Sequence, residues 1–174
     1  MRPQTPHSRA SSKRVAFVVQ RCGPEVNGGA EQHCLEAARR LAQQWPVEVL
    51  TTCALDSKSW SNHYPPGVDD RAGVAIRRFP VSVPRDFDSF SRWTLRIRDH
   101  RQVTSIAEQE AWMNAQGPVS EDLEQYIRRH RDEYDAFVFF TYIYATTYRV
   151  LSLVQDKSVL LPLDDGDWTL QLSL

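Results

Sequence analysis

The sequence contains no long apolar run. None of its apolar stretches approaches the roughly 18 residues that a membrane-spanning helix requires, and the N-terminus contains no apolar segment typical of a signal peptide. Residues 1–13 are polar and contain no acidic residue, so we expect a disordered leader before a folded part at residues 14–174. These features predict a cytoplasmic protein with at most peripheral membrane contact.

Neither sign of charge dominates the composition. The chain has 21 Lys and Arg residues, 22 Asp and Glu residues and a formal net charge of -1. A nucleic-acid-binding domain usually carries excess positive charge, so we expect no nucleic-acid partner. Arginines alternate with aromatic residues between residues 77 and 101, which would suit an anionic acceptor or a membrane face. Interspersed acids favour an ordinary solvated helix face instead.

Cysteine is scarce and its spacing indicates no special chemistry. Cys22, Cys34 and Cys53 are odd in number, and they match neither a disulfide framework nor paired metal ligands. We therefore expect a reducing compartment. Cys22 lies in a predicted ligand loop, but no sequence feature pairs this thiol with a base, so we interpret it as a structural residue.

The glycine patterns of common nucleotide-binding loops are also absent. Gly23 and Gly28 have the spacing of the first two P-loop glycines, but Gly29 and Ala30 follow where that loop has lysine and a hydroxyl residue. The dinucleotide pattern fails because no second glycine follows Gly23 at the required spacing. These absences argue against a P-loop nucleotidase and against a nicotinamide-dependent reductase.

A strand, a glycine-rich turn and a helix are nevertheless predicted in succession near the N-terminus. Residues 15–19 form an unbroken apolar run, as in a parallel strand covered on both faces. Apolar residues recur at helical spacing from Ala30 to Trp45, and Pro46 ends that pattern. Backbone N–H groups at such a join can bind an anion, which predicts a phosphate site around Gly28 and Gly29. The alternative is an ordinary tight turn in which Glu31 is a solvated end charge.

The remaining chain alternates between strand and helix patterns. Strands are predicted at 47–52, 74–79, 136–140 and 158–162, and helices at 85–113, 121–131 and 145–154, with a long polar loop at 53–72. Ser120 is the predicted N-cap of the second of these helices. This order predicts an α/β fold in one domain, with a Rossmann-like parallel sheet flanked by helices. Thr141, Tyr142 and Tyr144 follow a strand, so they either face a ligand crevice or cap the core.

Several of these segments together resemble the N-terminal, acceptor-side domain of family-4 glycosyltransferases of the GT-B fold. The similarity spans residues 14–172 and is carried by residues 15–31 with their Gly-Gly-Ala-Glu turn, and by residues 84–93, 135–144 and 159–162. It implies one half of a GT-B fold and retaining transfer of a sugar from a nucleotide-sugar to a glycan or lipid-linked acceptor. It implies no metal and no other cofactor.

The same resemblance implies where ligands bind. The residues expected beside the donor diphosphate or acceptor are Asn27, Gly28, Gly29, Ala30 and Glu31. Those expected to contact the acceptor are Thr141, Tyr142, Tyr144, Asp164 and Asp165. The two aspartates lie where relatives carry a histidine-acid-proline segment, and this chain has no histidine there, so its catalytic residues stay unassigned.

A second departure from the family concerns the donor-binding half. The chain contains no Glu-x7-Glu pair and no second Rossmann-like domain, so we expect an incomplete C-terminal end and no sugar transfer by the isolated chain. The alternative is a non-catalytic Rossmann-like binding or scaffold module that pairs with a separate catalytic half.

Overall fold

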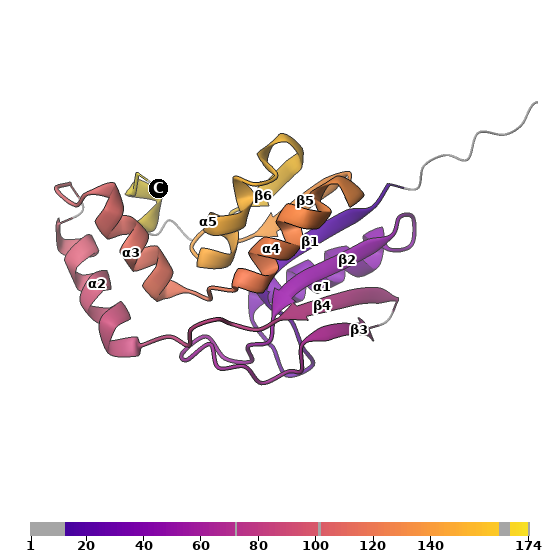
Figure 1. Ribbon diagram of the computed structural model, residues 1–174, viewed down its shortest axis with the longest axis horizontal. Coiled ribbons are helices and arrows are strands. Elements are labelled where there is room, and N and C mark those ends of the chain that lie inside the picture. The colour runs from indigo at the N-terminus through magenta and orange to yellow at the C-terminus, as the bar shows by residue number, and fades with distance from the viewer. Residues whose placement is uncertain (1–12, 72, 101, 164–167, 174) are drawn as a thin grey trace, which may run out of the picture.

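A sheet of six strands forms the centre of the computed structural model, which describes residues 13–71, 73–100, 102–163 and 168–173. The strands lie in the order β3-β4-β2-β1-β5-β6 (Figure 1). Neighbouring strands are parallel except β3, which runs antiparallel to β4 at the edge. Their bounds are Val15–Arg21 (β1), Val47–Thr52 (β2), Gly67–Arg71 (β3), Val74–Phe79 (β4), Ala136–Phe140 (β5) and Ser158–Leu161 (β6). The predicted α/β, Rossmann-like sheet is thereby confirmed.

Five α-helices flank this sheet within the described ranges. They are α1 (Gly29–Leu41), α2 (Phe87–His100), α3 (Ile106–Gln116), α4 (Glu121–His130) and α5 (Ala145–Leu151). The helices α2 and α3 pack on each other beyond the sheet (Figure 1). No helix in these ranges is both long and apolar enough to cross a membrane.

Alternate side chains of the central strands explain why helices cover both faces. Phe17 and Val19 of β1 pack with Cys34 and other residues of α1, whereas Val18 packs on the opposite face with Leu123 of α4. Every residue of β2, and every residue of β1 except the last, is buried. Such two-sided burial is the reason β1 has an unbroken apolar run at residues 15–19.

Several predicted boundaries differ from the structure, and the helix expected at 145–154 ends at Leu151. The expected loop at 53–72 contains β3, whose residues Gly67–Arg71 pair antiparallel with β4 although aspartate and glycine have low strand propensity. The expected helix at 85–113 is two helices, of which α2 ends at His100 and α3 begins at Ile106. The helix α1 ends at Leu41, four residues before the predicted end at Trp45, which is 37% exposed.

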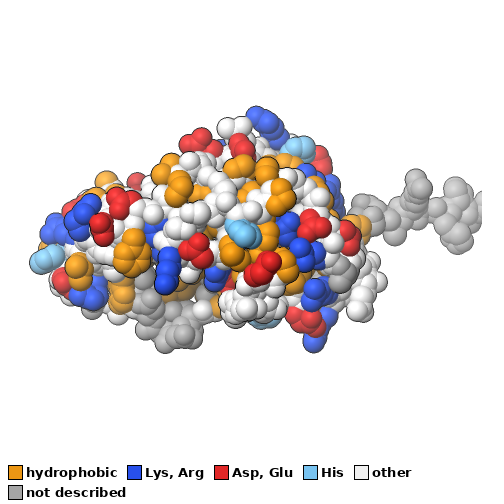
Figure 2. Space-filling view, turned by 90° about the horizontal axis from the view of Figure 1, so that it is seen from below, with side chains coloured by type: hydrophobic (Ala, Val, Ile, Leu, Met, Phe, Trp, Pro, Cys, Tyr) orange, Lys and Arg blue, Asp and Glu red, His pale blue; other side chains and the backbone are white. Residues whose placement is uncertain are grey.

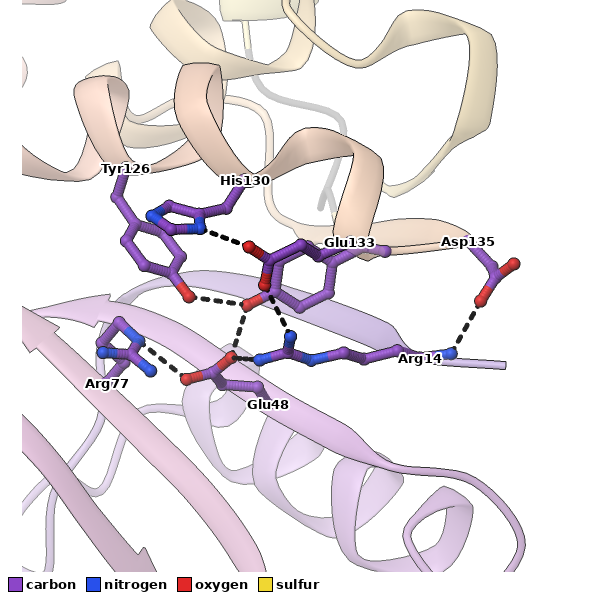
Figure 3. A network of polar contacts seen from close by, with 8 residues as sticks. Arg14, Glu48, Arg77, Tyr126, His130, Glu133 and Asp135 are labelled. Atoms are coloured by element: carbon purple, nitrogen blue, oxygen red, sulfur yellow. Dashed lines mark hydrogen bonds and ion pairs between the residues drawn. The ribbon is translucent and has the colours of Figure 1, made fainter. Parts of the chain in front are cut away.

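A buried carboxylate forms hydrogen bonds with several residues near the amino-terminal ends of the parallel strands (Figure 3). Glu48 of β2 accepts hydrogen bonds from Arg14 (2.9 Å), Arg77 (2.8 Å) and the Tyr134 hydroxyl. Arg14 also donates to Glu133 at 2.8 Å. Burial and the Glu48 carboxylate raise the pKa of Tyr134, so the phenol stays neutral. Because the charges here are paired with one another, this edge is structural.

Charged side chains of both signs are interspersed on the face seen in Figure 2. Figure 2 shows Lys and Arg among Asp and Glu on the face seen from below, with hydrophobic side chains between them. This distribution agrees with the formal net charge of -1. That face therefore presents no extended patch of a single sign.

Candidate functional site

The predicted site residues meet at the carboxyl edge of the parallel strands, opposite the Glu48 network. A hollow of about 360 Å³ lies between the end of β1, the start of α1 and the loop from β5 to α5. It is lined by Gln20, Arg21, Gly28, Gly29, Ala30, Glu31, Thr141, Tyr142, Ile143, Tyr144, Pro162 and Leu163. Seven of the ten predicted residues are thus brought together from two distant parts of the chain. Asn27 is exposed beside the hollow but does not line it, and Asp164 and Asp165 lie outside the described residues.

The two glycines at the mouth of α1 have different roles. Gly28, the N-cap, has ordinary backbone angles of φ -71° and ψ 145°. A Cβ atom on Gly28 would lie only 1.9 Å from Oε2 of Glu31, so this glycine makes room for the folded-back Glu31 side chain. A Cβ on Gly29 would meet no atom within 4 Å. The missing side chain of Gly29 therefore serves no internal packing and leaves open space at the hollow.

Glu31 is buried and paired, which overturns its interpretation as a solvated end charge. The residue is 5% exposed. Its Oε1 accepts from Gln20 Nε2 at 3.0 Å and from Arg21 Nε at 2.5 Å. Arg21 also donates to the carbonyl oxygen of Leu55 at 2.9 Å. The negative charge of Glu31 is thereby compensated inside the protein by the guanidinium of Arg21.

Two buried polar atoms of the hollow lack a partner among the described residues. Gln20 is 3% exposed and Thr141 is 7% exposed, yet Gln20 Oε1 and Thr141 Oγ1 have no hydrogen-bond partner there. Leaving one such atom unsatisfied costs about 1–3 kcal/mol. Because a carboxylate only accepts, the Nε2 group of Gln20 must face Glu31, and its Oε1 is directed elsewhere. Gln20 Oε1 is therefore left without a hydrogen-bond donor among the described residues.

The backbone of Thr141 is strained at the same place. Its φ is +70°, a left-handed conformation that a β-branched residue seldom adopts. Its N–H group donates to the carbonyl oxygen of Leu161 at 2.9 Å, which holds the strand end in this position. Strain of this kind costs about 1–3 kcal/mol and is concentrated at functional sites. The unsatisfied hydroxyl and the strained backbone thus belong to one residue of the hollow.

The first turn of α1 supplies backbone donors. The helix begins at Gly29, its N-cap offers no side-chain hydrogen bond, and Gln32 N makes the backbone bond to Gly28 O at 2.9 Å. The N–H groups before Gln32 have no carbonyl within the helix to accept them. The helix dipole also makes this end favourable for an anion. The geometry agrees with the predicted phosphate site.

The two predicted tyrosines occupy different sides of the hollow. The ring of Tyr144 contacts Trp60 edge-on, with centroids 5.5 Å apart. Burial, followed by the charge of Glu31, raises the pKa of Tyr144, so its phenol is neutral. The hydroxyl of Tyr142 lies 2.8 Å from Oγ1 of Thr169, near the C-terminal end of the described chain. Tyr144 therefore supports the hollow from the core, whereas Tyr142 joins it to a separate segment.

No family model matches this chain, and neither does any curated protein. The candidate function therefore depends on the geometry of the hollow together with the sequence resemblance.

Glu31, which is paired with Arg21, is the one carboxylate among the described lining residues. The described residues also contain no group of three or more His, Cys, Asp or Glu that could hold a metal ion. Burial raises the pKa of Cys22 to about 11, so it remains a thiol at neutral pH. This part of the chain can bind and orient a ligand, and it supplies no free carboxylate base.

Sequence reasoning missed Gln20 and Arg21. Both lie at the end of β1. Their position could have indicated a role in the site, because polar residues at the carboxyl end of a parallel strand commonly face a ligand crevice. Their contact with Glu31, ten and eleven residues away, depends on how the turn folds back.

Proposed function

We propose that this chain is the acceptor-side domain of a retaining glycosyltransferase with GT-B architecture. In this proposal the start of α1 holds the diphosphate of a nucleotide-sugar, and the loop after β5 contacts the acceptor. The single observation that carries it is the set of unsatisfied groups around one hollow. These are the free N–H groups of α1, Oε1 of Gln20 and Oγ1 of Thr141.

The chemistry of these groups favours a phosphorylated sugar. The N–H groups of α1 require an anionic acceptor, and the helix dipole favours one. Gln20 Oε1 requires a hydrogen-bond donor, because its orientation is set by Glu31. A plain phosphate satisfies the first requirement but, when fully ionised, not the second. A molecule with both hydroxyl and phosphate groups satisfies both.

The proposed role of these residues in the reaction is electrostatic. As the bond to the leaving diphosphate breaks, negative charge increases on its oxygens. Backbone N–H groups already aimed at that position stabilise the charge without reorganising, and the neighbouring Arg21–Glu31 pair adds no net repulsion. The described residues supply binding and orientation, whereas the grip on the nucleotide requires a second domain. We therefore expect the isolated chain to bind but not to transfer sugar.

A titration of the isotope-labelled chain tests the proposal. We expect uridine diphosphate and glucose 1-phosphate to shift the backbone amide signals of Gly29, Ala30 and Thr141, with no comparable shifts in α2. Sodium sulfate at matched ionic strength is the control for charge alone. If these amide signals do not shift, or if shifts are spread evenly over the arginines of α2, the start of α1 is not a specific phosphate site.

Turnover is measured separately with the same protein. The purified chain is incubated with nucleotide-sugars and a mixture of glycan and lipid-linked acceptors, and released nucleoside diphosphate is quantified. We expect none above the hydrolysis of the donor alone. Clear release that depends on acceptor would show that this chain contains catalytic residues of its own.

A further inference from the structure

A second cavity adjoins the proposed site and differs from it in chemistry. It has a volume of about 400 Å³ and lies between α3, α5, β6 and the C-terminal turn Trp168–Gln171. Most of its lining is apolar and includes Trp112, Met113, Leu151, Leu160, Leu170 and Leu172. This volume lies in the lower part of the range of small-molecule sites, which is roughly 300–1,000 Å³.

The two cavities share a wall. Tyr142 and Ile143 line both of them, so the two cavities are neighbours at these residues. Polar atoms at this wall are already satisfied, since the Tyr142 hydroxyl lies 2.8 Å from Thr169 Oγ1. The Tyr148 hydroxyl likewise donates to Glu110 at 2.9 Å. The apolar cavity therefore has little need of a polar group, in contrast to its neighbour.

Apolar side chains at the rim remain open to solvent. Leu160 is 39% exposed and Leu170 is 57% exposed, whereas Trp112 and Met113 at the base are buried. Covering these side chains would bury apolar surface, which is favourable. An occupant that reached the base would thus be held by hydrophobic contact from both β6 and α3.

We propose that this cavity binds the apolar part of an amphipathic acceptor. The hydroxyl-bearing head of that acceptor lies at Thr141, and an attached alkyl or aromatic group enters between Leu151, Leu160 and Leu170. The shared lining argues for this occupant over a separate apolar ligand, because Tyr142 and Ile143 border both the head site and the tail site. This inference rests on the proposed function and narrows its acceptor to molecules with an apolar group.

The test uses butyl, hexyl and octyl β-D-glucoside below their micelle concentrations. Each methylene that enters the cavity should tighten binding about three- to fourfold, the factor that corresponds to burying a CH₂ group. Methyl signals of Met113 and Leu160 and the amide signal of Thr141 should move together in one titration. Affinity that does not depend on alkyl length would overturn the inference.

Two surface variants separate the cavity from general hydrophobic binding. Leu170→Gln changes the rim, and Leu95→Gln changes a similarly exposed leucine on α2 that does not line the cavity, at 51% exposure. Both positions are exposed, so both variants should fold. We expect Leu170→Gln to weaken octyl glucoside binding several-fold and to flatten the dependence on alkyl length, and Leu95→Gln to change neither. Equal effects of the two variants would contradict a defined cavity.

Parallel titration with uridine diphosphate distinguishes the two proposals. If the diphosphate shifts Gly29 while the glucosides leave Met113 and Leu160 unchanged, the acceptor inference fails and the proposed function stands. If the glucosides bind but the diphosphate does not reach Gly29, the proposed function fails, and the acceptor role fails with it. Shifts of Leu170 that depend on protein concentration alone would identify a second copy of the chain as the occupant and overturn the inference.

Discussion

Replacing the adjacent glycines Gly28 and Gly29 by alanine should change stability in opposite directions. Both have backbone conformations that alanine can adopt, since Gly28 has φ -71° and Gly29 is the first residue of α1. Their surroundings differ. A Cβ at position 28 would lie 1.9 Å from Oε2 and 2.7 Å from Cδ of Glu31, whereas a Cβ at position 29 would meet nothing within 4 Å.

The expected magnitudes follow from these contacts. Gly29→Ala removes backbone freedom from the unfolded chain without a clash, which should raise the free energy of unfolding by about 0.4–1 kcal/mol. Gly28→Ala forces the Glu31 carboxylate to rotate away from Gln20 and Arg21. Losing a buried charge-assisted hydrogen bond, in addition to the poorer N-cap, should lower the free energy of unfolding by about 1–3 kcal/mol.

Urea unfolding followed by tryptophan fluorescence measures both changes. A double-mutant cycle with Glu31→Ala isolates the clash, because in that background Gly28→Ala should cost only the poorer N-cap, about 0.5–1 kcal/mol. The same Gly29→Ala protein should bind uridine diphosphate more weakly, since its methyl group occupies space that the ligand requires. If Gly29→Ala raises the free energy of unfolding and weakens diphosphate binding, the glycine at position 29 serves ligand binding and not folding.

Three results would refute this reasoning. If both variants lose stability equally, the turn requires glycine for its backbone and not for the space that Glu31 occupies. If Gly28→Ala costs as much without Glu31 as with it, the clash is not the cause. If Gly29→Ala binds the diphosphate as tightly as the original chain, the open space at position 29 is not part of the ligand site.

Three further measurements address other parts of the molecule. Glu48→Gln should destabilise the fold by about 1–3 kcal/mol, because it replaces a buried carboxylate that accepts charge-assisted hydrogen bonds from Arg14 and Arg77 by a neutral amide; thermal unfolding checks this. Cys22, whose pKa burial raises to about 11, should react with a thiol reagent at pH 8 only after urea unfolds the chain. Hydrogen bonds from Ser59 lower the pKa of Asp56 below 3.8, so its stabilising contribution, present above 3.8, should disappear as pH falls through the lower folded value. In acid titrations, Asp56→Asn should remove that part of the pH dependence.

The sequence by itself determined most of the sheet. Unbroken apolar runs predicted β1 and β5 because strands covered on both faces have no solvated side to alternate with. The N-cap at Ser120 was equally local, and its side chain accepts from Leu123 N as predicted. Parallel strand order then made it expected that Gly29 and Thr141 would meet, since the carboxyl ends of such strands share one edge.

Three features depend on tertiary contacts and could not be read from the local sequence pattern. The strand β3 exists because β4 offers an unpaired edge, although its own residues, Gly67–Arg71, disfavour a strand. The burial of Glu31 depends on the missing side chain of Gly28 and on Gln20 and Arg21 reaching it across the turn. The left-handed backbone of Thr141 is imposed by its bond to β6 and its surroundings, against its own preference. Propensity and periodicity describe each residue with its near neighbours, whereas these features arise from contacts between segments that only the folded chain brings together.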